Sequence, residues 1–179
     1  MERRPTNRKL PPRPSVSAPR HHLLRAVLSF VRAARSLPSV RRIALLGSLA
    51  TDKPVPKDAD LLVIIDASMD LAALAAMGRR LMGTAQTSNL GADIFLAGEA
   101  GRYMGRICHY RECHPRAVCR ALNCGRLQHL NDDLQIVTLS PELISAPPID
   151  LWPHVVRHVV VPVDTAALLL VELEKDGTR

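Results

Sequence analysis

The chain has 179 residues, enough for one compact domain with a hydrophobic core and a tail. Its formal net charge is +7 at pH 7, and no apolar run approaches the length of a transmembrane span without charged residues, so we expect no membrane segment. The first twenty residues hold six basic residues against Glu2 and carry +5 of this charge. The rest is only mildly basic, so charge alone is weak evidence for nucleic-acid binding.

Two interpretations fit the basic N-terminal stretch. Residues 1–20 are rich in proline and arginine, which predicts a disordered arm. A transit peptide is the alternative, because no acidic residue lies between Glu2 and Asp52. However, Arg outnumbers Lys twenty to four along the whole chain, which is typical of genome-wide codon bias. We therefore expect a bacterial, cytoplasmic protein.

The apolar pattern predicts alternating helices and strands in the first half of the chain. An apolar stripe over 21–37 predicts an amphipathic helix that ends before Pro38. Residues 68–83 predict a second helix, with Ser68 as its N-cap and a glycine at its end. Short apolar runs predict three buried strands, at 40–47, 60–66 and 91–98.

The second half has a weaker pattern. Residues 99–133 are rich in Cys, His and Arg and show no clear period. Residues 134–139 predict an added strand, and 165–175, capped by Asp164, a closing helix. Residues 147–153 predict an extended linker, because each proline disfavours helix at the residue before it.

These elements predict an α+β fold in which the three strands share a mixed sheet with helices packed on it. We expect three regions. They are the basic arm at 1–20, a core at 21–98, and an extension at 99–179 that contains the Cys/His/Arg-rich segment and packs on the core.

Three aspartates are candidate ligands of a divalent ion. Alternate residues of a strand face the same side, so Asp58 and Asp60 project together while Ala59 points into the core. Asp93 joins them if its strand is the neighbour. Clustered carboxylates are hard oxygen ligands, suited to Mg²⁺ or Mn²⁺ with substrate phosphates. The alternative is three structural residues: a strand cap, an exposed aspartate and the partner of an arginine.

A Gly-Ser pair ends the first predicted strand, nine residues ahead of Asp58. Gly47 allows close approach of the backbone to a phosphate, while backbone N–H groups and the Ser48 hydroxyl can donate to an anion. The pair therefore predicts a phosphate cradle beside the carboxylates.

Together, Gly47-Ser48, Asp58-Ala59-Asp60 and a later Asp93 on an adjacent strand resemble the nucleotidyltransferase superfamily. That is the fold of DNA polymerase beta, kanamycin nucleotidyltransferase and the minimal nucleotidyltransferases of bacterial toxin–antitoxin pairs. The resemblance covers residues 23–98. It implies a nucleotidyltransferase-like sheet and metal-dependent transfer of a nucleoside monophosphate from an NTP to an acceptor. By resemblance, Gly47 and Ser48 grip the triphosphate, Asp58 and Asp60 bind the metal, and Asp93 completes the site as the base.

The sequence of the turn that follows Gly47-Ser48 differs from that of the minimal nucleotidyltransferases. They often read Gly-Ser-x-Ala-Arg-Gly and then Ser-Asp-x-Asp, whereas here Leu49-Ala50-Thr51-Asp52 follows, and Lys57 precedes Asp58. We expect Lys57 to supply part of the missing positive charge at the nucleotide; the alternative is an ordinary exposed lysine. The missing arginine favours a second hypothesis, a catalytically weak binding module for RNA or a protein partner, as in antitoxins. The acceptor stays open among a small molecule, RNA and protein.

The four cysteines cluster within seventeen residues, at Cys108, Cys113, Cys119 and Cys124. Four thiolates, or a mixture with histidines, would suit a structural Zn²⁺. None of the pairs is Cys-x2-Cys, so four reduced thiols without metal are the alternative. Nearby His109 and His114 are predicted to face solvent. A zinc-stabilised scaffold that binds no nucleotide is a third interpretation of the chain.

Overall fold

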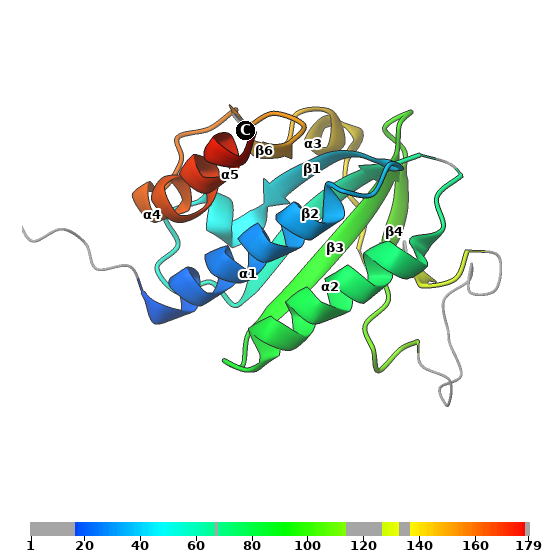
Figure 1. Ribbon diagram of the computed structural model, residues 1–179, viewed down its shortest axis with the longest axis horizontal. Helices are drawn as coiled ribbons and strands as arrows, with labels where there is room; N and C mark the ends of the chain where they lie inside the picture. Colours follow the sequence, from blue (N-terminus) through cyan, green and yellow to red (C-terminus); the bar gives the residue numbers. More distant parts are fainter. Residues whose placement is uncertain (1–16, 67, 114–126, 133–136, 178–179) are drawn as a thin grey trace, which may run out of the picture.

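A computed structural model describes residues 17–66, 68–113, 127–132 and 137–177. Within them, seven strands form one mixed sheet in the order β5-β4-β3-β2-β1-β6-β7 (Figure 1). Strands β2 and β3 are parallel, and the other neighbours are antiparallel. The strands are β1 Val40–Leu46, β2 Asp58–Ile65, β3 Gly91–Gly98, β4 Tyr103–Ile107, β5 Leu130–Asn131, β6 Ile149–Trp152 and β7 Val156–Arg157.

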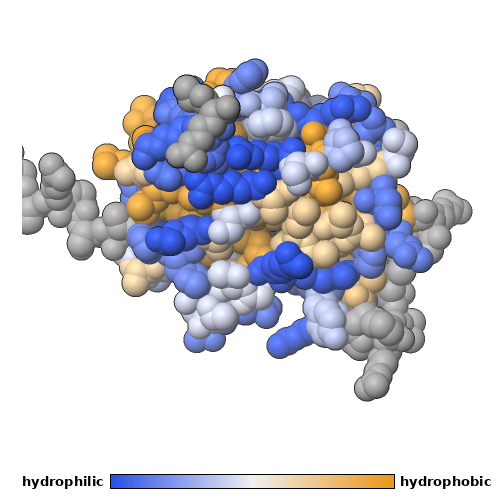
Figure 2. Space-filling view, viewed as in Figure 1, coloured by the Kyte–Doolittle hydropathy of each residue, from blue (hydrophilic) through white to orange (hydrophobic). Residues whose placement is uncertain are grey.

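Helices cover one face of this sheet. Figure 1 shows α1 (Ala18–Ala34) and α2 (Leu71–Gln86) side by side across it, with the C-terminal helical segment next to α1. That segment comprises α4 (Val163–Thr165), the π-helical turn η2 (Ala166–Leu170) and α5 (Val171–Gly177). Helix α1 lies flat because its apolar stripe is buried, while Arg25 and Arg32 project outward. In Figure 2, hydrophilic side chains gather over α1 and the C-terminal segment, while more apolar surface lies over the alanine-rich α2.

The two faces of β2 belong to different parts of the molecule. Ala59, Leu61 and Val63 point into the main core beneath the helices. Leu62 and Ile64 point the other way, into a smaller cluster that also contains Ile144 of the short helix α3 (Pro141–Ser145). Because strand residues alternate, Asp58 and Asp60 lie on this second face, the one away from α1 and α2.

The structure confirms the α+β class and the three core strands in one sheet. The helix predicted at 68–83 begins at Leu71 instead, because Asp70 rather than Ser68 accepts a hydrogen bond from the backbone N–H of Ala72. It also continues past Gly83, which lies inside it.

Other boundaries differ in the second half. The linker predicted at 147–153 is wrong: Ile149–Trp152 form β6, which pairs with β1 although prolines flank it on both sides. The patternless stretch 99–133 contains β4 and β5. Of the strand predicted at 134–139, residues 134–136 lie outside the described ranges, and 137–139 have no regular structure. The predicted closing helix is the segment from α4 to α5.

Helix α1 begins at Ala18, so Arg20, assigned above to the arm, lies in its first turn. This side chain is 5% exposed. Its Nη1 donates to the carbonyl oxygens of Ser48, Thr51 and Lys53 at 2.9 to 3.2 Å. Its Nε and Nη2 donate to the Asp164 carboxylate at 2.5 and 3.0 Å. Arg20 therefore joins α1, the loop after β1 and the C-terminal helical segment.

No helix in the described ranges is both long enough and apolar enough to cross a membrane.

Replacing Arg20 by Ala should lower the free energy of unfolding by about 3–5 kcal/mol, the usual cost of removing one partner of a buried ion pair. The carboxylate of Asp164 and three carbonyl oxygens would lose their donor. Arg25→Ala, on the exposed face of the same helix, is the matched control and should change stability by less than about 0.5 kcal/mol. Urea unfolding measures both, and equal effects would show that Arg20 acts only as another helix residue.

Candidate active site

The parallel pairing of β2 and β3 brings the three aspartates to one place. Asp60 is in register with Asp93, and Asp58 with Gly91, so Asp60 and Asp93 are direct neighbours on strands about 4.8 Å apart. Ala59 and Ala92, which alternate with them, are buried on the helical side. Asp58, Asp60 and Asp93 therefore share the second face of the sheet, at the strand ends where β2 and β3 begin.

The predicted Gly-Ser turn lies against these carboxylates. Leu46, the last residue of β1, pairs with Asp60, and the 3-10 turn η1 (Gly47–Ala50) follows at once. Gly47 has a φ of +61°, and a Cβ built on it would come 2.0 Å from Oδ2 of Asp60. Only glycine fits there, because any side chain would need both a strained backbone and the space of the carboxylate.

The carboxylates repel one another. The pKa of Asp60 is raised from 3.8 to about 6, first by burial and then by the charges of Asp58 and Asp93. Lys53 lowers it, but not enough to compensate. The cation that acts on Asp60 is thus Lys53 of the loop after η1, which the sequence analysis did not single out. Lys57 is exposed, and its carbonyl oxygen accepts from the N–H of Gly91.

Asp93 has protein partners. Nε2 of His109, from the turn after β4, lies 3.0 Å from Oδ1 of Asp93, and Nε of Arg106 lies 3.9 Å from the same oxygen. Arg106 is held by Glu112 through two hydrogen bonds of 2.8 and 3.0 Å. Burial opposes ionisation of Glu112, but the bonds from Arg106 and from the N–H of His109 outweigh it and lower its pKa to about 2.

The prediction that His109 faces solvent agrees with its side chain, which is 40% exposed, but it did not foresee the contact of Nε2 with Asp93. The contact spans 16 residues along the chain and depends on the antiparallel pairing of β3 with β4. The only sequence signal for it is the concentration of Arg, His and Glu between 106 and 112.

Three carboxylates have the hard oxygen donors that suit Mg²⁺ or Mn²⁺. Their mutual repulsion on Asp60 would also be relieved by a cation. Among the described residues, however, no group of three or more His, Cys, Asp or Glu side chains is placed so that it could hold a metal ion. The donor chemistry fits a divalent ion, whereas the side-chain positions do not yet converge. Since Asp93 contacts His109, we expect ion binding by all three to be coupled to release of His109.

Only part of the cysteine segment is described. Cys108 is buried directly after β4, and Sγ of Cys113 lies 3.6 Å from Nδ1 of His129. Cys119, Cys124 and His114 lie outside the described residues. The zinc site therefore stays a prediction.

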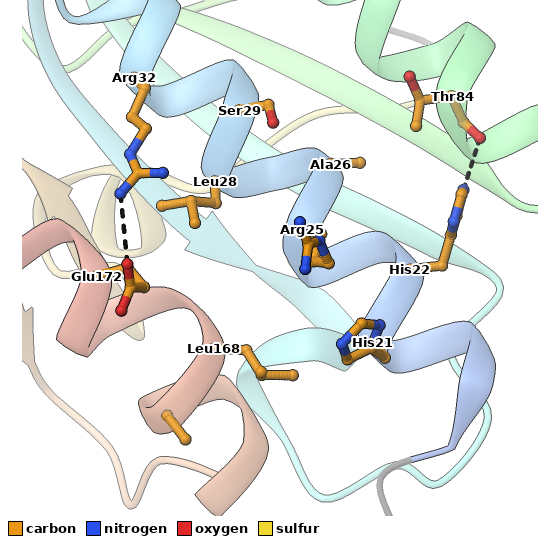
Figure 3. A pocket seen from close by; sticks show the side chains of 11 residues that line it. His21, His22, Arg25, Ala26, Leu28, Ser29, Arg32, Thr84, Leu168 and Glu172 are labelled. Carbon is orange, nitrogen blue, oxygen red and sulfur yellow. Dashed lines mark hydrogen bonds and ion pairs between the residues drawn. The ribbon is translucent and has the colours of Figure 1, made fainter.

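A hollow of about 770 Å³ lies between α1, α2 and the C-terminal helical segment (Figure 3). Two of its polar side chains form contacts between the helices: Arg32 pairs with Glu172 at 3.6 Å, and Nε2 of His22 lies 2.7 Å from the carbonyl oxygen of Thr84. The hollow is on the helical side of the sheet, opposite Asp60. Its size alone does not connect it with the carboxylates.

Asp60→Asn should raise the free energy of unfolding of the metal-free protein by about 1–2 kcal/mol at pH 7.5, after allowance for solvent screening. The folded-state pKa of about 6 exceeds the ordinary 3.8, so between these pH values the folded state holds a proton that the unfolded state has lost. The cost of ionised Asp60 is complete above pH 6 and vanishes as the pH falls toward 4. The advantage of the variant should shrink over that window in urea unfolding. A less stable variant at pH 7.5 would identify Asp60 as the structural partner of a cation.

Gly47→Ala should destabilise the protein by about 1–3 kcal/mol through the strained φ and the contact with Asp60. The control is Gly83→Ala, where the added methyl group meets nothing within 4 Å. Because alanine favours the helix, that variant should be as stable as the wild type or up to about 1 kcal/mol more stable. Thermal unfolding compares them, and two equal shifts would contradict the close packing of Gly47 on Asp60.

Comparisons with family models, curated proteins and solved structures find no match for this chain. The relationship to the nucleotidyltransferases thus stays the prediction made from Gly47-Ser48 and the three aspartates. What the site does must be argued from its own geometry: a glycine turn and three carboxylates at one end of a parallel strand pair.

Proposed function

We propose that the protein transfers a nucleoside monophosphate from an NTP to an acceptor hydroxyl, in a reaction that depends on Mg²⁺ or Mn²⁺. The observation that carries this proposal is the shared face of β2 and β3, where Asp60 and Asp93 are in register and Gly47 lies against the Asp60 carboxylate. A phosphate can bind at the glycine turn, and a cation can bind next to it at the carboxylates. Nucleotidyl transfer requires both.

The turn is suited to the triphosphate. Gly47 has no side chain to obstruct a phosphate beside Asp60. The Ser48 hydroxyl donates to the carbonyl oxygen of Asp58 over a long 3.4 Å, so a phosphate oxygen competes easily for it. The exposed Lys53 and Lys57 flank the loop and add positive charge near the site. Arg20 fixes the loop but is neutralised by Asp164, so it holds the backbone and leaves charge compensation to the lysines.

In the proposed reaction, the acceptor oxygen forms a bond to the α-phosphorus of the NTP. The bond from that phosphorus to its bridging oxygen breaks, and pyrophosphate leaves. Asp93 takes the proton of the acceptor hydroxyl. His109, which contacts Oδ1 of Asp93 in the absence of an ion, would be released when the ion binds. A divalent ion held by Asp58, Asp60 and Asp93 would neutralise phosphate charge and favour the departure of pyrophosphate.

A binding module without turnover is the competing proposal. It is supported by the contacts of Asp93 with His109 and Arg106, which satisfy one carboxylate without a metal. In that case the protein would bind an NTP, RNA or a protein partner and release no pyrophosphate.

The two proposals are separated by incubating the purified protein with radiolabelled NTPs and Mg²⁺ or Mn²⁺. Release of pyrophosphate, with transfer of label to the protein or to an added acceptor, is expected. Asp93→Asn should slow it about 10²-fold or more because the base is lost, and Asp60→Asn should abolish the metal-dependent release because a ligand of the ion is lost. Glu99→Gln, an exposed carboxylate beyond the far end of β3, is the control and should keep full activity.

Nucleotide binding without pyrophosphate release would favour the binding module. Binding is followed as the rise in melting temperature with NTP and Mg²⁺. If neither binding nor turnover occurs with any NTP, nucleotidyl transfer is wrong.

A further inference from the structure

A second hollow, of about 420 Å³, has His109 among its lining residues and lies on the helical side of the sheet. It is enclosed by the C-terminal half of α2, the start of β3 and the turn of residues 109–111 that follows β4. Figure 1 shows this turn descending beside α2. The ring of His109 lines the hollow, while its Nε2 contacts Asp93. His109 therefore borders both the hollow and the face of the sheet that carries the carboxylates.

Two guanidinium groups line this hollow, those of Arg79 and Arg111. Nη2 of Arg79 donates to Nδ1 of His129 at 3.0 Å, a bond to a ring nitrogen that carries no proton. The pKa of His129 is lowered by burial and by the charge of Arg79, which disfavours its charged form. Nε of Arg79 is buried and has no hydrogen-bond partner among the described residues.

Neither arginine forms an ion pair with a carboxylate in the part of the chain that the structure describes. Of the undescribed residues, 114–126 contain no Asp or Glu, whereas 1–16 contain Glu2 and 133–136 contain Asp133. Arg79 is partly buried, and a partly buried guanidinium without a counter-ion is costly, because its charge has lost part of its hydration and gained no opposite charge. Arg111 is exposed and adds a second positive charge to the lining. Among the described residues, these two charges are placed to take an anion.

The dimensions and lining of the hollow define that anion. Arginine binds phosphate with paired N–H donors, and two guanidiniums match the double charge of a phosphate monoester. Met82 and Ala92 supply an apolar wall and Gln86 an amide. A volume of about 420 Å³ suits a small molecule.

We propose that this hollow binds the phosphate group of a small phosphorylated molecule through Arg79 and Arg111, and that the rest of that molecule reaches past His109 toward Asp93. Phosphate binding here does not depend on nucleotidyl transfer. The identification of the bound molecule as the acceptor does rest on the proposed function.

The test is calorimetric titration of the full chain with inorganic phosphate, without metal or NTP, at ionic strength held constant with sodium chloride. Saturable binding is expected. Arg79→Gln and Arg111→Gln should each weaken it about tenfold or more, since each removes a charged donor pair. Arg79→Lys should restore part of the affinity by restoring the charge.

Two variants provide the controls. Arg80→Gln removes an exposed charge adjacent to Arg79 that does not line the hollow, and it should bind phosphate like the wild type. Asp60→Asn should also leave phosphate affinity unchanged, which separates this site from the glycine turn. Arg111 is exposed, so its variant is expected to fold even if Arg79→Gln does not.

Absence of saturable binding in the wild type, or equal weakening by Arg80→Gln and Arg111→Gln, would overturn the proposal. A protein that binds phosphate and transfers no nucleotide would keep the anion site and refute only the proposed function. If the protein transfers nucleotide but binds no phosphate, the anion site is refuted and the proposed function is kept.

Discussion

The buried guanidinium of Arg20 is the contact on which the site depends. The loop between β1 and β2 places three carbonyl oxygens, those of Ser48, Thr51 and Lys53, toward one point, and Arg20 satisfies them while Asp164 balances its charge. Without Arg20, the carbonyl oxygens of Thr51 and Lys53 would need water or a different loop conformation, whereas that of Ser48 keeps the N–H and the hydroxyl of Thr51 as donors. The same loop begins at Gly47, whose position against Asp60 requires a positive φ. The shape of the proposed phosphate cradle is thus set by a residue of α1 that does not itself face the cradle.

The two faces of the sheet carry different kinds of side chain. Its helical face is apolar and buries the main core, and the carboxylates at the start of β2 and β3 lie on the other face. The cost of clustering them appears in the raised pKa of Asp60, a group held where its charge is unfavourable. In a structural ion pair of this chain the pKa shifts the other way: the pKa of Glu112 is lowered to about 2 because Arg106 stabilises its charge. This difference is the physical reason to connect Asp60 with a ligand.

The sequence predicted those features that depend on neighbouring residues. The apolar runs located β1, β2 and β3, and the alternation of Asp58 with Ala59 identified the face on which the carboxylates lie. Features that depend on distant contacts were missed. Strand β6 was taken for a linker, because its prolines are compatible with a short strand and only pairing with β1 makes it one. The partner of Arg20, Asp164, is 144 positions away, and that of His109, Asp93, is 16 positions away; no local pattern reveals such pairs.

The separation between Arg20 and Asp164 has a consequence for how the protein is made. During synthesis, β1 and the glycine turn leave the ribosome more than a hundred residues before β6 and the counter-ion of Arg20. Until then, one edge of β1 has no neighbouring strand, and the loop carbonyls have a donor whose charge is not balanced. A nascent chain that ends before Ile149 therefore has an open, apolar strand edge available for pairing with other chains. The proposed phosphate cradle, although encoded early, is completed only when the distant helical segment docks.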